Sequence, residues 1–130
     1  MKNLFFLLIS ASLLTLMSCD KDEDCNPGSL ETNIVGEWNV TITGLPLPVV
    51  QVEFRANGDL VDQSGVLVED VILGMTVESK TYSVPSDTII TLTASNSLGS
   101  LDYNVDVVSY TCDEIIVIDQ GTEYTLKRRE

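Results

Sequence analysis

The residue types that could do chemistry in this chain are carboxylates and thiols, because its 130 residues contain 20 Asp and Glu, three Cys and no His. Without an imidazole, Ser-His-Asp and Cys-His nucleophiles, His-ligated zinc and most general-base hydrolases are excluded. The acids are scattered over separate segments, and the sequence contains no Gly-rich phosphate loop, no Cys-x-x-Cys and no nucleophile elbow. We therefore predict no catalytic residue, no cofactor and no enzymatic activity.

Some acidic residues occur in patterns that could hold a hard cation. One set matches the spacing of a calcium-binding loop: Asp20, Asp22, Asp24 and Glu31. The turn position of that loop requires Gly, but here it is Cys25, and no amphipathic helices flank the segment. Two adjacent pairs, Glu69-Asp70 and Asp113-Glu114, are more typical of solvated loop ends than of cation sites. We predict no metal ligand.

A net charge of −13 and a hydrophobic content of 44% limit the remaining classes. Nucleic-acid binding is excluded, because no basic patch is available to displace counterions from phosphates. The apolar content is sufficient for a packed core, and the length fits one domain, which we expect to be monomeric.

The N-terminus carries a targeting signal. Lys2 precedes an apolar stretch, residues 4–16, which has the length of a signal-peptide core and is short for a membrane span. The sequence Leu-Met-Ser-Cys19 that follows resembles the bacterial lipobox. This resemblance implies cleavage before Cys19 and acyl chains on that residue, which anchor the protein to a membrane. A cleavable secretory signal with an incidental Cys, or an uncleaved anchor, is the alternative.

An acidic run, residues 20–24, follows Cys19 directly. It resembles the surface-export signal of Bacteroidota lipoproteins, which implies a lipid-anchored outer-membrane protein exposed at the cell surface. A solvated charged tether is the alternative. The predicted organisation is a signal peptide (1–18), a lipidated Cys with an acidic tether (19–32) and a folded domain (33–130).

Two cysteines remain for the domain, Cys25 and Cys112, which are 87 residues apart. In an oxidising compartment an even pair favours a disulfide. In the chain-entropy model, closing a loop of this length stabilises the fold by about 4–5 kcal/mol, less any strain. Two free thiols are the alternative.

The mature chain has the pattern of an all-β protein, in which apolar and polar residues alternate between closely spaced turn signals. We expect eight or nine strands. A short helical turn is expected at 33–35, a hairpin turn at Asn57-Gly58, a strand end at Pro85 and a strand covered on both sides at 115–118. An up-and-down antiparallel barrel is predicted, because closure removes exposed sheet edges. A two-sheet sandwich is the alternative.

The motif Gly36-Glu37-Trp38 at the start of the first predicted strand resembles the lipocalin signature. Together with three later segments it resembles the lipocalin-like domain lipoproteins of Bacteroidota: Val52 to Gly58, Tyr82 to Asp87 and Tyr124 to Arg128. The resemblance implies a small barrel that Trp38 plugs at one end while Arg128 packs across its ring. The candidate ligand-facing interior is Val40, Ile42, Val52, Phe54, Tyr103, Val105, Val107 and Tyr124.

These observations predict a surface-tethered, non-enzymatic binding protein. Its partner would be a small apolar ligand in the barrel or a protein or glycan at the mouth loops, residues 44–48 and 96–100. A structural envelope lipoprotein with a filled barrel is one alternative. A carboxylate-only glycan-processing accessory enzyme is the other.

Overall fold

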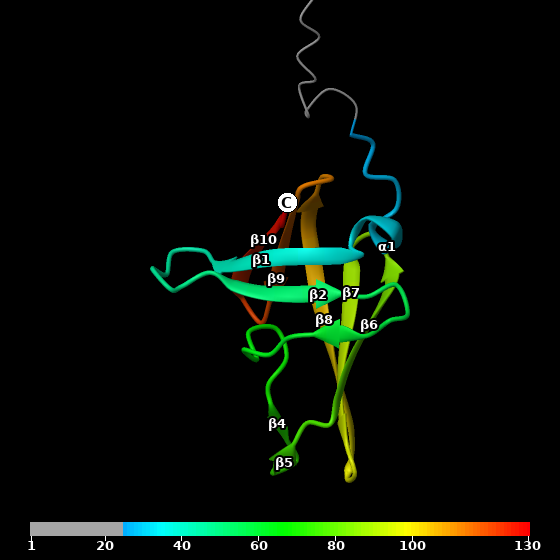
Figure 1. The fold of residues 1–130 in the computed structure, drawn as a ribbon, viewed down its shortest axis with the longest axis vertical. Helices are drawn as coiled ribbons and strands as arrows, with labels where there is room; N and C mark the ends of the chain where they lie inside the picture. Colours follow the sequence, from blue (N-terminus) through cyan, green and yellow to red (C-terminus); the bar gives the residue numbers. More distant parts are fainter. Residues whose placement is uncertain (1–24) are drawn as a thin grey trace, which may run out of the picture.

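The computed structural model describes residues 25–130. The expectations for residues 1–24, including lipidation of Cys19, the acidic run and most of the calcium-loop pattern, lie outside the described residues. Within them the protein is all-β apart from one helical turn, α1 (Leu30–Asn33) (Figure 1). No helix in the described part of the chain is long and apolar enough to cross a membrane.

Eight of the strands form one antiparallel sheet in the order β3-β2-β1-β10-β9-β8-β7-β6. The sheet strands are β1 (Gly36–Ile42), β2 (Val50–Phe54), β3 (Leu60–Val61), β6 (Ser79–Ser86), β7 (Ile89–Asn96), β8 (Gly99–Tyr110), β9 (Glu114–Asp119) and β10 (Thr122–Arg128). Two further strands, β4 (Val71–Ile72) and β5 (Met75–Thr76), make a separate hairpin.

The sheet curls into a nearly closed barrel. The first and last strands pair along their length, from Trp38 opposite Arg128 to Ile42 opposite Tyr124. The remaining seam lies between β3 and β6, where Asp59 forms an isolated bridge with Thr81. The predicted antiparallel barrel of eight strands is therefore confirmed over the sandwich.

Alternation along the strands places the core inside the barrel. Trp38, Val40, Val52, Phe54 and Val105 are buried, as predicted. Four residues that we also expected inside are only half-buried: Ile42, Tyr103, Val107 and Tyr124. Buried residues from β7 and β9 complete the core: Ile90, Leu92, Ala94, Ile115 and Val117.

The structure corrects four local predictions. Helix α1 begins three residues before the predicted turn at 33–35 and overlaps it only at Asn33, and its Leu30, within the expected tether, is fully buried. Strand β6 continues through Pro85, which an irregularity between Ser83 and Ser86 accommodates on a strand whose other edge is almost unpaired. The predicted mouth loop 96–100 is mostly strand, with only two residues in the turn. In β9, Ile116 and Ile118 are half-buried, so the strand is covered fully on one side only.

Candidate functional site

The closed end of the barrel, which we define by α1, Trp38 and Arg128, is held together by the guanidinium of Arg128. Its Cζ atom lies 4.2 Å from the centroid of the Trp38 ring. Its nitrogens donate hydrogen bonds to the carbonyls of Cys112 (2.7 Å), Val35 (3.1 Å) and Asn33 (2.5 Å). The structure thus brings together the signature residues, and the indole Nε1 of Trp38 donates to the Ile34 carbonyl (2.7 Å).

Cys25 and Cys112 form a disulfide, as predicted, with their Cα atoms 6.0 Å apart. The bond lies at the closed end, because the Cys112 carbonyl is a partner of Arg128. The hydroxyl of Tyr110 donates to the Gly28 carbonyl (3.0 Å), which fixes the same N-terminal segment. The described chain therefore enters the domain at the closed end.

The interior of the barrel is filled. The cavity among the core side chains has a volume of about 10 Å³ and an entirely apolar lining: Phe54, Leu67, Ile90, Leu92, Val105, Val117 and Leu126. A cavity needs about 10–15 Å³ to hold even one water molecule. The candidate ligand-facing residues Val40, Val52, Phe54 and Val105 therefore pack against other side chains and leave no room for a ligand.

The loop of residues 62–70, which we call the plug, fills the opposite, open end. Asp62 is buried, and its carboxylate accepts hydrogen bonds from the backbone N–H groups of Val66 (3.1 Å), Leu67 (2.9 Å) and Val68 (2.9 Å). The Nζ atom of Lys80 donates to the carbonyls of Asp62 (2.7 Å) and Val68 (2.9 Å) and to the carboxylate of Asp70 (2.6 Å). These bonds hold Val68 in the core.

Next to the plug, at the open end of the barrel, lies an open concavity of about 290 Å³, which we call the bowl. Its lining comes from the plug, β8, and the β9–β10 hairpin: Gly65, Val66, Leu67, Glu69, Tyr103, Asp119, Gln120, Thr122 and Tyr124. Burial raises the pKa of the Asp119 carboxyl above its ordinary value. Burial also raises the pKa of Tyr103 and of Tyr124, and the charge of Asp119 adds to both shifts. The bowl is thus a partly dehydrated site of negative charge.

Exposed apolar side chains also lie near this end. The β1–β2 loop projects away from the barrel, to the left in Figure 1. At the start of the loop, the backbone N–H of Thr43 donates to the Glu123 carbonyl of the β9–β10 hairpin (3.0 Å). The loop exposes Leu45, Leu47 and Val49, and the tips of the β4–β5 and β7–β8 hairpins expose Val71, Leu73, Met75 and Leu98.

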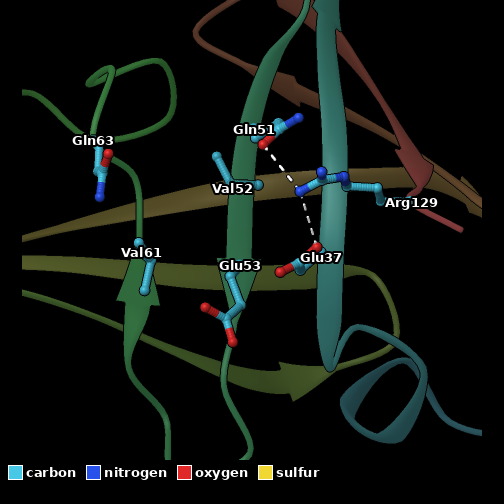
Figure 2. A pocket seen from close by; sticks show the side chains of 7 residues that line it. All are labelled: Glu37, Gln51, Val52, Glu53, Val61, Gln63 and Arg129. Carbon is cyan, nitrogen blue, oxygen red and sulfur yellow. Dashed lines mark hydrogen bonds and ion pairs between the residues drawn. The ribbon is translucent and has the colours of Figure 1, made fainter.

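A smaller pocket of about 170 Å³ lies on the outer face of β1, β2 and β3 (Figure 2). There the Nη1 atom of Arg129 donates to the carboxylate of Glu37 (3.1 Å) and to the side-chain oxygen of Gln51 (3.1 Å). Glu53, which also lines the pocket, pairs with Arg55 (3.2 Å). Because its charges are paired within the protein, this pocket is a weaker candidate than the bowl.

The bowl contains two residues from the predicted interior, Tyr103 and Tyr124, and the structure adds Asp119 and Glu69. Asp119 was missed because nothing in the sequence distinguishes it from other acids beside a turn. The other acids considered as cation ligands are separated: Asp70 pairs with Lys80 (2.6 Å) and Glu114 approaches Lys127 (4.0 Å). Among residues 25–130, no three His, Cys, Asp or Glu side chains are grouped to hold a metal ion.

Comparison with known proteins found no matching family model and no matching curated protein. Among solved structures, the chain is similar to a lipocalin-like protein from Bacteroides thetaiotaomicron VPI-5482. The two share 18% sequence identity, the match covers 75% of this chain and 97% of the other, and the TM-score is 0.46. This similarity assigns no ligand and no residue role.

Proposed function

We propose that this protein is a lipid-anchored binding protein of the outer-membrane surface, without enzymatic activity, that takes its partner at the open end of a filled barrel. The observation that carries the proposal is the contrast between the two spaces. The interior cavity measures about 10 Å³, whereas the bowl measures about 290 Å³ and opens to solvent. A small apolar ligand inside the barrel is therefore not part of the proposal.

The position of the disulfide supports an outward-facing open end. Cys25 is bonded at the closed end, and Cys19, the proposed lipidated residue, precedes it by six positions. Six extended residues span about 20 Å. A lipid on Cys19 would therefore hold the closed end near the membrane and direct the bowl and the projecting β1–β2 loop away from it.

The filled interior also favours a second candidate, a structural envelope lipoprotein with no ligand. The two differ in what the open end contacts in the cell. The enzyme alternative would place its acids in the bowl, where Asp119 and Glu69 both lie. It predicts glycan cleavage that is lost in Asp119→Asn, whereas the binding proposal predicts none in either protein.

Native mass spectrometry of protein purified from its own cells tests the proposal. We expect a non-covalent companion on the wild type that is lost when Thr122→Trp obstructs the bowl and is retained in Asp113→Trp, at the exposed β8–β9 turn. A companion retained in both variants, or none on any of the three proteins, would overturn the open-end proposal. The mass of the N-terminal peptide tests the anchor, and an unmodified Cys19 would refute it.

A further inference from the structure

The walls of the bowl carry two carboxylates and two phenols. Glu69 comes from the plug, Tyr103 from β8, Asp119 from the end of β9 and Tyr124 from β10. The charge of Asp119 acts on both tyrosines, and that of Glu69 acts on Tyr103. Four separate segments therefore direct acidic and aromatic groups into one space.

These four side chains have no polar partner in the described part of the protein, and in this the two tyrosines differ from the other two tyrosines of the chain. The hydroxyl of Tyr82 donates to the Arg55 carbonyl (2.7 Å), and that of Tyr110 donates to the Gly28 carbonyl (3.0 Å). Within residues 25–130, by contrast, the side chains of the bowl's tyrosines and acids make no hydrogen bond or ion pair with the protein. Their polar groups remain available to a ligand.

The basic residues of the described chain are all engaged elsewhere, and none lines the bowl. They are Arg55 (with Glu53), Lys80 (with Asp62 and Asp70), Lys127 (with Glu114), Arg128 (at the closed end) and Arg129 (with Glu37). A partly buried carboxylate without a counter-charge is costly to the folded protein. The raised pKa of Asp119 agrees with that cost.

The ligand chemistry follows from this charge distribution. An anion would be repelled, and a neutral ligand would leave the carboxylates uncompensated. An organic cation would neutralise them and would also gain cation–π attraction from aromatic rings, which is the usual basis for recognition of ammonium ligands. The side chain of Leu67 in the lining offers apolar contact.

We propose that the bowl binds a small organic ammonium ion with an apolar body, its charge held by Asp119 and Glu69 beside the rings of Tyr103 and Tyr124. This inference deepens the proposed function, on which it rests, by giving the ligand's chemical class. The bowl would select its ligand by its positive charge, and the barrel interior would take no part in binding.

Calorimetric titration with two matched pairs of probes tests the inference. One pair is choline and its neutral carbon isostere, and the other is phenethylammonium and phenethyl alcohol. We expect at least one cation to bind about tenfold or more tightly than its neutral partner, as an ion pair with cation–π support allows. Asp119→Asn should weaken the binding of that cation about threefold to fivefold, since asparagine keeps the shape of the side chain and removes its charge.

Asp106→Asn is the matched control, because Asp106 lies on β8 near Tyr103 but is exposed on the outer face. It removes one negative charge and should change the affinity less than twofold, an effect of about the size of screened surface charges. Equal affinities for cation and neutral probe, no binding of either cation, or equal losses in the two variants would overturn the inference. A native companion that is neutral and lost in Thr122→Trp would overturn only the ligand class and leave the proposed function intact.

Discussion

The guanidinium of Arg128 lies over the indole of Trp38, with 4.2 Å between Cζ and the ring centroid, while their strands pair directly. The same guanidinium bonds carbonyls of Cys112, Val35 and Asn33. One side chain thus joins β10, β1, the β8–β9 turn and the end of α1. This contact stabilises the closed end of the barrel and does not involve the open end.

Arg128→Lys should destabilise the protein by about 1–3 kcal/mol, because lysine keeps the charge but cannot reproduce the forked hydrogen bonds. Trp38→Ala should cost about 3–5 kcal/mol, since the ring is fully buried. Urea unfolding measures both, with the exposed neighbour Lys127→Ala as the control, expected to change the free energy of unfolding by less than about 0.5 kcal/mol. An Arg128→Lys variant as stable as the control would disprove the role of the fork.

Gly36→Ala should destabilise the closed end by two separate effects. Residue 36 has a φ of 132°, and an added Cβ would stand 2.9 Å from the Nη1 atom of Arg128. The backbone strain alone costs about 1–3 kcal/mol. Gly44→Ala is the matched control, because its φ is 81° but nothing lies within 4 Å of the added Cβ. Equal losses of unfolding free energy in the two variants would show that the approach of Arg128 is unimportant.

Asp62→Ala should release the plug, because it leaves three backbone N–H groups without their acceptor. We expect a loss of about 2–4 kcal/mol and faster hydrogen exchange confined to residues 62–70. Asp70→Asn removes only an exposed partner of Lys80 and should cost less than about 1 kcal/mol. Unchanged exchange at Val66, Leu67 and Val68 in Asp62→Ala would contradict the structure of the plug.

Whether the sequence predicts an element of this fold depends on which interactions hold that element in place. Alternation identifies β1 and β2, because burial alternates along each of them, and the Gln120-Gly121 turn marks the start of β10. The stretch 66–77 carries apolar residues without a clear period. Its order comes from hydrogen bonds to the side chains of Asp62 and Lys80, which a pattern of alternation does not reveal. Pro85 indicated a strand end, yet a strand with an almost unpaired edge tolerates a proline.

The candidate site was only partly predictable for a similar reason. Tyr103 and Tyr124 were identified by alternation, which indicates the inward face but not whether a side chain meets core or solvent. Asp119 joins them through the pairing of β9 with β10, whereas Glu69 joins them only because the plug folds back over the barrel mouth. The filling of the interior also depends on the plug, because Leu67 lines the residual cavity.

The raised pKa of Asp119 gives a prediction about stability and pH. The folded state favours the protonated carboxyl, so the ionised form opposes folding at neutral pH, and this opposition fades as the pH falls through the raised pKa. Asp119→Asn should therefore have an equal or higher Tm than the wild type at pH about 7, with a difference that shrinks on acidification. Choline binding by the wild type should weaken over the same range, because protonation removes the negative charge of Asp119. A markedly lower Tm for Asp119→Asn would show that Asp119 stabilises the fold.

Site-specific photo-cross-linking on intact cells tests whether the open end of the barrel faces outward and binds a partner. A photoreactive residue in place of Gln120, on the rim of the bowl, is compared with one in place of Asp113, in the exposed turn at the closed end. We expect a covalent adduct, of a small molecule or a macromolecule, on the peptide containing position 120 and none at position 113. An adduct at position 113 alone, or at neither position, would contradict an outward-facing binding site at the open end of the barrel.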